Sequence, residues 1–461
     1  MIAFYLPALL VVAVLTYLFG RQRAYAVAGS HPSVLHSRPN YHGFYTAIWS
    51  AVPGLILLVL WAAIAPRVYD SIVSSRFAGL LSGLSELNRS TFFRDARALA
   101  HNTLFGTASP DVEAAAAVYR SLWLAGDAIL GLLLAALVAA GLSHAWRSIS
   151  VRKRTRHFVE RFVMGVLIAC SVVAILTTAG IVLSLIFESL RFFQKVPFFD
   201  FLFGIHWSPQ SAFEGAGAEA ETNSEVFGAV PLFVGTLLIT AIAMLVAAPI
   251  GLMSAIYLSD YAGARFRAIA KPVLEILAGI PTVVYGFFAA LTVAPFIRRA
   301  GEAIGLAPSS ESALAAGLVM GVMIIPFVSS LSDDVINAVP QSLRDGSAGL
   351  GATKSETIRK VVLPAALPGI VSAMLLAVSR AIGETMIVVM AAGLAANMTL
   401  NPLEAVTTVT VQIVTLLVGD QEFDSAKTLA AFALGLMLFI VTLALNVVAL
   451  RVVQKYREQY D

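Results

Sequence analysis

The chain has 461 residues, of which 58% are hydrophobic and 13% are charged, and its formal net charge is +3. A soluble domain of this size does not need so much apolar surface, so the composition excludes a soluble globular protein and predicts a polytopic membrane protein. The single cysteine, Cys170, excludes a disulfide framework and a thiolate metal site. The seven histidines are scattered along the chain, and we expect no metal centre.

About nine apolar stretches are long enough to cross a bilayer as helices, which predicts an all-α fold. In the first stretch Arg21 and Arg23 follow the apolar core, whereas a secretory signal carries its basic residues before the core. We therefore expect a retained helix whose amino terminus lies outside the cytosol. The predicted spans are Ile2–Phe19, Phe44–Ala65, Ser121–Leu142, 162–186, 232–258, 272–297, 313–332, 364–391 and 428–450.

The distribution of basic residues supports this orientation. With an outer amino terminus, the predicted cytosolic loops hold about twice as many Lys and Arg residues as the outer segments. The most basic loop, from His144 to Arg161, then lies in the cytosol, and so does the carboxyl terminus. The opposite topology would reverse the usual positive-inside bias.

The motifs divide the chain near residue 160. Residues 1–160 form a predicted amino-terminal extension with three spans and a small extracytoplasmic helical segment at 67–120, which is too polar to cross the membrane. Residues 161–461 contain the other six spans and all the motifs described below. The outer loop from Phe187 to Val230 is longer than a connector requires, which predicts either a docking surface or a flexible insertion.

One predicted span, 272–297, contains Pro281 between two glycines, Gly279 and Gly286. Proline removes a backbone donor and kinks a helix, while glycine permits close packing or a non-helical turn. Interrupted spans often line substrate paths, because the freed backbone groups need a polar cavity. We expect Pro281 and the nearby Tyr285 to line such a path; a packing kink without substrate contact is the alternative.

The stretch from Val339 to Pro364 is polar and connects two predicted spans. Gly351 permits a bend with positive φ, and Thr353 and Glu356 have the spacing of a capping box that begins the next helix. By composition alone, an ordinary amphipathic loop between membrane helices would look the same.

The span after this loop carries two charges, Arg380 and Glu384, at a depth where hydrocarbon is expected. Such a pair costs several kcal/mol unless it faces protein or water, so it predicts a functional site. The spacing of four residues also permits a purely structural ion pair on one helix.

The polar loop resembles the signature loop of ATP-binding cassette (ABC) importer permeases. That signature is Glu-Ala-Ala, three free positions, Gly, nine free positions, an aliphatic residue, one free position and Leu-Pro. This chain keeps the spacing throughout and changes the opening triplet; its matching residues are Asp345, Gly346, Ser347, Gly351, Val361, Leu363 and Pro364. The resemblance implies that loop 339–364 forms a short helix that docks into a groove of a cytosolic ATPase.

The string SRAIGETM, at 379–386, resembles the corresponding segment of phosphate-specific ABC permeases, the PstC and PstA pair. Met386 and the long outer loop favour the PstC type. The resemblance covers about residues 160–455 and implies a six-helix permease core that transports inorganic phosphate. It implies substrate-path roles for Arg380, Gly383, Glu384 and Thr385. The three amino-terminal spans look like an extension that only some members carry.

The charges in this string suit the implied substrate. A phosphate anion that crosses a low-dielectric barrier needs a cation or donors near its midpoint, and a bidentate guanidinium matches the geometry of its oxygens. Arg380 alone would hold the anion too tightly, so we expect Glu384 to neutralise Arg380 and let phosphate leave, or to bridge to a partner permease.

The resemblance also implies partners and a location. The expected partners are a second permease of PstA type, a cytosolic ATPase dimer of PstB type, an extracytoplasmic phosphate-binding protein that docks on the outer loop, and the lipid of the bacterial inner membrane, but no nucleic acid. The chain itself is not expected to be an enzyme or to hold a cofactor; ATP and Mg belong on the ATPase. In GLGATKS, at 349–355, Thr353 stands where a phosphate-binding loop requires Gly, and no strand precedes it.

Two other functions stay open. The first is an ABC permease for another oxyanion, such as sulfate or molybdate, although the segment from Arg380 to Glu384 favours phosphate. The second is an ion-coupled secondary transporter or channel, which should show paired inverted repeats and several intramembrane acids. The sequence has no second copy of the Arg/Glu motif.

Overall fold

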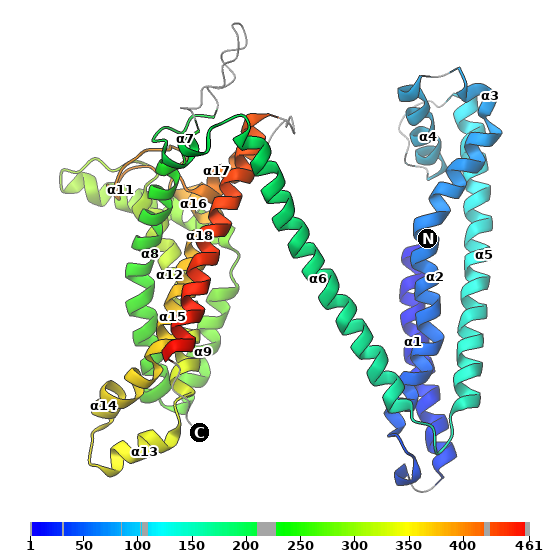
Figure 1. The fold of residues 1–461 in the computed structure, drawn as a ribbon, viewed down its shortest axis with the longest axis horizontal. Coiled ribbons are helices and arrows are strands. Elements are labelled where there is room, and N and C mark those ends of the chain that lie inside the picture. The colour runs from blue at the N-terminus through cyan, green and yellow to red at the C-terminus, as the bar shows by residue number, and fades with distance from the viewer. Residues whose placement is uncertain are drawn as a thin grey trace. The chain divides into compact units, whose positions relative to one another are not determined.

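Figure 1 shows the computed structural model of the protein, which describes residues 2–29, 32–83, 85–101, 103, 109–209, 227–418 and 425–456. The described chain is helical, and its strand-like pairing is one isolated bridge between Trp207 and Phe227. Contacts divide the chain into two compact units, Met1–Ile175 and Leu176–Asp461. Their boundary lies inside helix α6 (Thr155–Phe193), as does residue 160, so the predicted domain division stays a prediction.

Nine helical segments in the described part of the chain are long and apolar enough to cross a membrane, which confirms the predicted number and the all-α fold. Several of them extend beyond the predicted spans because polar residues continue the helix at its ends. The observed segments are Phe4–Ala28, Pro39–Arg76, Pro110–Ser148, Thr155–Phe193, Val230–Tyr261, Thr282–Ala303, Ala313–Asn337, Lys354–Ile382 and Ala426–Val452.

The first unit is built on three long helices, α1 (Ile2–Ala28), α2 (Pro39–Arg76) and α5 (Pro110–Ser148). Between α2 and α5 the chain forms the short helix α3 (Ala78–Leu81) and the amphipathic α4 (Glu86–Ala100), which is the helix predicted within segment 67–120. Both lie at one end of the long helices (Figure 1). Two apolar clusters hold the unit together. One joins α2, α4 and α5 around Tyr119, and the other joins α1, α2 and α5 around Leu130.

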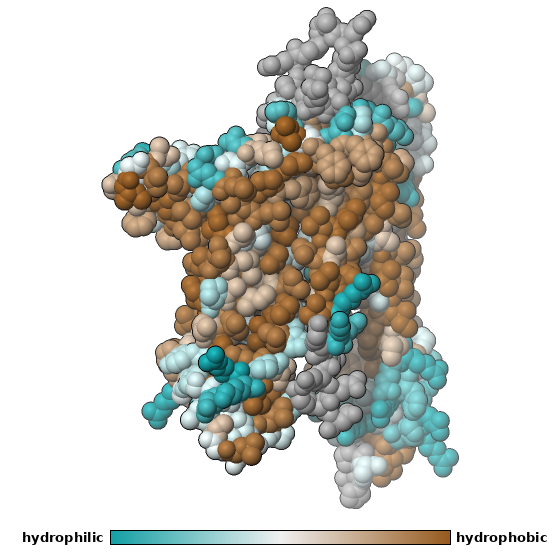
Figure 2. Space-filling model, turned by 60° about the vertical axis from the view of Figure 1, so that its left-hand side comes forward, coloured by the Kyte–Doolittle hydropathy of each residue, from teal (hydrophilic) through white to brown (hydrophobic). Residues whose placement is uncertain are grey.

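In the second unit α12 (Ala313–Asn337) is the central helix, and it packs against α8 (Val230–Ile256), α9 (Ala264–Gly279) and α15 (Leu363–Ile382). Alanine, glycine and β-branched residues fill the contacts, as is usual where membrane helices approach closely. Helix α18 (Ala426–Tyr456) covers α15 and α17 (Val409–Leu417). Figure 2 shows a broad hydrophobic surface on these helices between two more hydrophilic ends, as a membrane protein requires.

Two predicted spans are interrupted. The sequence indicated a kink or a non-helical turn at Pro281, whereas the continuous helix expected through Glu384 was wrong. The span predicted at 272–297 divides into α9, which ends at Gly279, and α10 (Thr282–Phe288), which continues through η5 (Ala289–Val293) into α11 (Ala294–Ala303). Pro281 ends the first helix instead of kinking it, because the residue before a proline prefers extended backbone, and Ile280 has φ −68° and ψ 129°. The span predicted at 364–391 divides into α15, which ends at Ile382, and α16 (Met386–Ala391).

The outer loop predicted from Phe187 to Val230 is only partly described. Helix α6 continues to Phe193, and α7 (Phe198–Phe203) packs its buried Phe201 against Phe192 and Phe227. Residues 210–226, which form part of the predicted docking surface for a binding protein, lie outside the described residues.

The close approach of α2 and α5 predicts a size limit at Gly141. A Cβ atom there would lie 2.1 Å from the backbone oxygen of Trp49, whereas a Cβ at Gly165 would meet nothing within 4 Å. We expect Gly141→Ala to destabilise the first unit by about 1–3 kcal/mol, because backbone atoms cannot move aside as a flexible side chain can. Gly165→Ala should be neutral or about 0.5–1 kcal/mol stabilising. Thermal unfolding of both purified variants in detergent checks this; equal melting temperatures would contradict the packing.

Candidate functional site

The predicted docking loop folds as a helix, a bend and a second helix. Helix α13 (Gln341–Gly349) is followed by Gly351 with φ 85°, which confirms the predicted positive φ. Thr353 and Glu356 then form the predicted capping box at the start of α14 (Lys354–Thr357). Helix α14 continues through the π-helical turn η6 (Ile358–Val362) into α15, which begins at Leu363 and Pro364.

The triplet that matches the ABC signature lies on α13. The Asp345 carboxylate accepts a hydrogen bond of 2.9 Å from Gln341, and the hydroxyls of Ser347 and Thr357 are 2.9 Å apart. This second contact fixes α13 against the following helix. Gly346 faces open space, and the side chain of Leu350, at the end of α13, is 91% exposed. An apolar side chain so fully exposed beside the bend suits contact with another protein.

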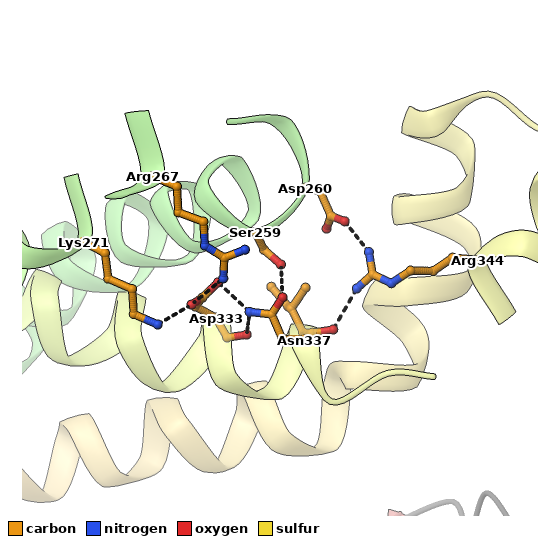
Figure 3. Close-up of polar contacts among 8 residues, drawn as sticks. Ser259, Asp260, Arg267, Lys271, Asp333, Asn337 and Arg344 are labelled. Carbon is orange, nitrogen blue, oxygen red and sulfur yellow. Dashed lines mark hydrogen bonds and ion pairs between the residues drawn. The ribbon is translucent and has the colours of Figure 1, made fainter. Parts of the chain in front are cut away.

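Arg344 anchors α13 to the rest of the second unit. Its guanidinium forms an ion pair with Asp260 and donates a hydrogen bond of 2.8 Å to the backbone oxygen of Ile336 (Figure 3). Asp260 lies in η4 (Tyr257–Tyr261) at the end of α8, and Ile336 lies in α12. The Arg344 and Asp260 side chains are only 16% and 8% exposed, so this pair is largely removed from water.

A second polar cluster lies beside this anchor and centres on Asp333 of α12, whose side chain is 5% exposed. Its carboxylate accepts hydrogen bonds from Arg267 at 3.1 Å, Lys271 at 2.9 Å and the Asn337 amide at 2.8 Å. The Asn337 oxygen in turn accepts a bond of 3.1 Å from Ser259 in η4 (Figure 3). The cluster therefore joins α9, α12 and η4.

These residues were not predicted from the sequence, although one signal was present. An adjacent acid pair, Asp333 and Asp334, ends an otherwise apolar span, and an acid there needs a partner. Its basic partners lie more than sixty residues earlier, so only the folded chain identifies them.

A cavity of about 290 Å³ connects this cluster to the predicted substrate path. Asp333 and Lys271 line it at one place, and Arg380 of α15 lines it at another, together with Glu275 and the hydroxyl-bearing Ser329. The Arg380 guanidinium lies 5.5 Å from the ring centre of Phe327. Within the described chain, no carboxylate forms an ion pair with Arg380, so this cation is available to an anion in the cavity.

Glu384 does not lie one helical turn beyond Arg380, as the sequence analysis expected. Helix α15 ends at Ile382, and the Glu384 carboxylate accepts hydrogen bonds from the backbone N–H groups of Met386 at 3.1 Å and Ile387 at 3.4 Å. It therefore satisfies the first N–H groups of helix α16, and no ion pair joins it to Arg380 among the described residues. A side chain that satisfies the free N–H groups of a new helix explains why the span is interrupted here.

The two interrupted spans lie against each other. The Tyr285 hydroxyl donates to the backbone oxygen of Leu277 at 2.9 Å, which satisfies an acceptor at the break around Pro281. One residue further, Gly286 faces α16: a Cβ there would lie 2.7 Å from the Met390 sulfur and 3.1 Å from the Met386 oxygen. The structure thus brings the Pro281 and Glu384 breaks together.

The remaining predicted path residues lie within the second break. The Thr385 hydroxyl is 3.4 Å from the backbone oxygen of Gly383, a long contact. Thr410 donates to the backbone oxygen of Glu384 at 2.8 Å, which satisfies a group that the interrupted helix leaves free. The roles of Gly383 and Thr385 in transport stay predictions.

Comparison with known proteins agrees with this arrangement. Residues 6–177 match a family described as a phosphate ATP-binding cassette transporter, and residues 247–458 match the inner membrane component of binding-protein-dependent transport systems. The first match corresponds to the first compact unit, and the second contains both helix breaks and the docking loop.

Individual relatives place the chain more narrowly. A probable ABC transporter permease of Bacillus subtilis, YqgH, is 33% identical over 59% of this chain and 84% of its own length. A phosphate transport system permease protein PstC of Mycobacterium tuberculosis is 35% identical over 50% of this chain and 73% of its own length. One of Mesorhizobium japonicum is 29% identical over 61% of this chain and 86% of its own length. The chain belongs to the PstC family of ABC transporter permeases.

The anchor of α13 can be tested without any partner. Arg344→Gln leaves Asp260 buried without its cation, which should lower the local opening free energy around residues 341–349 by about 3 kcal/mol. Hydrogen–deuterium exchange in this segment should rise by about a hundredfold. Arg298→Gln is the control, because the Arg298 and Glu302 side chains are 52% and 56% exposed and such pairs contribute under about 1 kcal/mol. Unchanged exchange in α13 would show that Arg344 does not hold it.

Proposed function

We propose that this chain is the PstC-type permease subunit of an ATP-driven importer of inorganic phosphate. The observation that carries the proposal is Arg380, a membrane-embedded guanidinium that lines a cavity beside a helix break and has no acidic partner among the described residues. Relatives named as phosphate transport system permeases support the choice of substrate. A guanidinium binds phosphate through two parallel hydrogen bonds, which suits a dehydrated oxyanion.

Membership of a two-permease importer implies the rest of the assembly. We propose that a PstA-type permease completes the path, that a PstB-type ATPase dimer binds α13 and the exposed Leu350, and that a phosphate-binding protein docks on the outer loop. ATP and Mg would be bound by the ATPase alone. The proposed orientation places α13 in the cytosol and the amino terminus outside, in agreement with the distribution of basic residues.

The polar clusters suggest how the ATPase acts on the path. Phosphate that leaves Arg380 reaches the part of the same cavity where Asp333 holds Lys271. An arriving anion can compete with the Asp333 carboxylate for this cation. Because Asn337 links Asp333 to η4, and Arg344 links η4 to α13, a displacement of α13 would move the groups around Asp333. The clusters thus couple docking to release.

The proposal is tested by transport in cells that lack other phosphate uptake. Labelled phosphate should enter, unlabelled phosphate should compete, and sulfate and molybdate should not. Uptake should stop when ATP is depleted and should persist when the proton gradient alone is collapsed. Competition by sulfate would favour a permease for another oxyanion, and loss of uptake with the proton gradient would favour an ion-coupled transporter.

Arg380 and Glu384 should have different roles. Arg380→Gln removes a charged donor worth about 1.5–3 kcal/mol, so phosphate uptake should fall by about tenfold to a hundredfold. Glu384→Gln keeps an oxygen that can accept from the α16 backbone, so the chain should fold normally. Because it removes a negative charge that repels phosphate beside the path, the variant should release phosphate more slowly. Uptake kinetics in membrane vesicles measure both effects. Arg299→Gln, at an exposed arginine, is the control.

A structural pair would behave differently. Both single variants would then lose stability to a similar degree, and the exchanged variant Arg380→Glu with Glu384→Arg would recover activity. Stable single variants with defective uptake would support the path. Unstable single variants that the exchange rescues would refute it.

The bend at Gly351 should be needed for coupling to the ATPase. Gly351→Val places a β-branched residue at φ 85°, at a cost of about 1–2 kcal/mol of strain, and should change the position of α14 relative to α13. We expect normal membrane insertion but loss of ATPase co-purification and uptake. Gly305→Val is a matched control, because Gly305 also has positive φ, 82°, and open space around it, but lies between α11 and α12. Equal co-purification by both variants would exclude the bend from the docking surface.

A further inference from the structure

The first unit contains a cavity of about 730 Å³ that is not part of the proposed transport path. It lies between α2 and α5 where α4 covers them, with the Tyr119 cluster on one side and the Leu130 cluster on the other. Both neighbouring clusters are well packed, so the cavity is a defined space between two apolar cores. Its volume is within the range of sites for small organic molecules.

Aromatic side chains form much of the cavity wall. Trp61 and Tyr69 come from α2, and Tyr119 and Trp123 come from α5. His101 stacks on Trp123 with ring centres 4.0 Å apart and an angle of 25° between the planes. Such a wall binds apolar bodies, and its ring faces attract organic cations.

Glycine brings the aromatic side chains close to α5. A Cβ at Gly126 would lie 1.9 Å from the Tyr69 hydroxyl oxygen and 3.4 Å from the Trp61 ring. The absence of a side chain at Gly126 therefore lets both rings reach the wall next to Asp127, the following residue of α5.

The charged groups of the lining differ in whether they already have partners. Asp70 accepts a hydrogen bond of 2.6 Å from the Tyr119 hydroxyl and lies 3.7 Å from the Arg97 guanidinium. Arg97 also donates to the backbone oxygen of Phe93 at 3.1 Å, and Arg120 donates to that of Leu99 at 3.0 Å. Both arginines of the lining are thus engaged by the protein itself.

Asp127 is the exception. Its Oδ2 atom is buried, and no donor within the described residues bonds it, although Asp127 belongs to the helix that crosses the membrane. A buried carboxylate oxygen without a partner is costly, and an acid at this depth requires a cation or a donor. The unsatisfied charge of the cavity is therefore negative, and it lies beside Trp61 and Tyr69.

We propose that this cavity is a binding site for an organic ammonium, with its cationic group on Asp127 and its apolar body against the Trp61, Tyr69 and Trp123 rings. The ammonium would supply the donor that Asp127 Oδ2 lacks and would gain cation–π attraction from the rings. The ammonium can belong to a free solute or to the head group of an aminophospholipid. The site is separate from the path at Arg380, so it gives the extension a ligand of its own.

Calorimetric titration of the full-length protein in detergent tests the site with two probes of opposite charge, benzylammonium and benzenesulfonate. The cation should bind and the anion should not. Asp127→Asn should weaken binding of the cation at least tenfold, and Trp123→Leu should weaken it several-fold. Asp95→Asn is the control, because Asp95 lies on α4 beside Arg94 and does not line the cavity. Binding of benzenesulfonate instead, or equal affinity in the wild type and Asp127→Asn, would overturn the proposal.

Thermal unfolding without ligand provides an independent measurement. Asp127→Asn removes an unpaired charge, so it should raise the melting temperature, and saturating benzylammonium should reduce or abolish the difference from the wild type. A difference that the cation does not alter would show that Asp127 has only a structural role and would refute the site.

Titrations in phosphatidylglycerol nanodiscs, with and without phosphatidylethanolamine, distinguish the source of the ammonium. Weaker apparent binding of the probe in the presence of phosphatidylethanolamine identifies the lipid head group as the occupant. Unchanged binding identifies a free organic cation. Absence of cation binding in both nanodiscs would overturn the proposal.

Discussion

The second unit depends on how one buried carboxylate is satisfied. Asp333 lies at the end of the central helix, and a charge so far from water is tolerated only when several donors surround it. Arg267 and Lys271 supply two of these donors from α9, and Asn337 supplies a third from the next turn of α12. This requirement fixes α9 against α12 and, through Ser259, fixes the end of α8 as well. The position of α13 then follows from the adjacent Arg344 anchor.

A related constraint governs the membrane core, where interrupted helices expose backbone groups that lipid cannot satisfy. Tyr285 and Thr410 donate to backbone oxygens at the breaks, and the Glu384 carboxylate accepts from N–H groups at the start of α16. These contacts use the polar groups of the breaks themselves. Arg380, by contrast, lies over the ring of Phe327 and forms no ion pair within the described chain. The polar groups of this region thus divide into those that stabilise the breaks and one that is available to a ligand.

Features that depend on local sequence could be predicted, and features that depend on distant residues could not. The number of spans, the positive φ of Gly351 and the capping box of Thr353 each follow from a few neighbouring residues, and the structure contains all of them. The partners of Asp333 come from another helix, and no spacing indicates them. The prediction of a continuous helix through Glu384 was wrong. The apolar pattern of the segment is helical throughout, and it does not show that the Glu384 carboxylate accepts from the N–H of Met386 at the start of a new helix. At Pro281 the sequence indicated a kink or a non-helical turn, and the helix ends there because the residue before proline prefers an extended backbone.

The π-helical turn η6, between the docking loop and α15, has a geometric consequence for the path. A π turn contains one residue more than an α turn, so every residue beyond it is rotated about the helix axis relative to an uninterrupted α-helix. One residue corresponds to about 100° of rotation. Without the additional residue, α15 could keep its length and composition, yet Arg380 would be directed away from the cavity that it now lines. The direction of the Arg380 side chain thus depends on the π-helical turn some twenty residues earlier, next to the surface proposed to bind the ATPase.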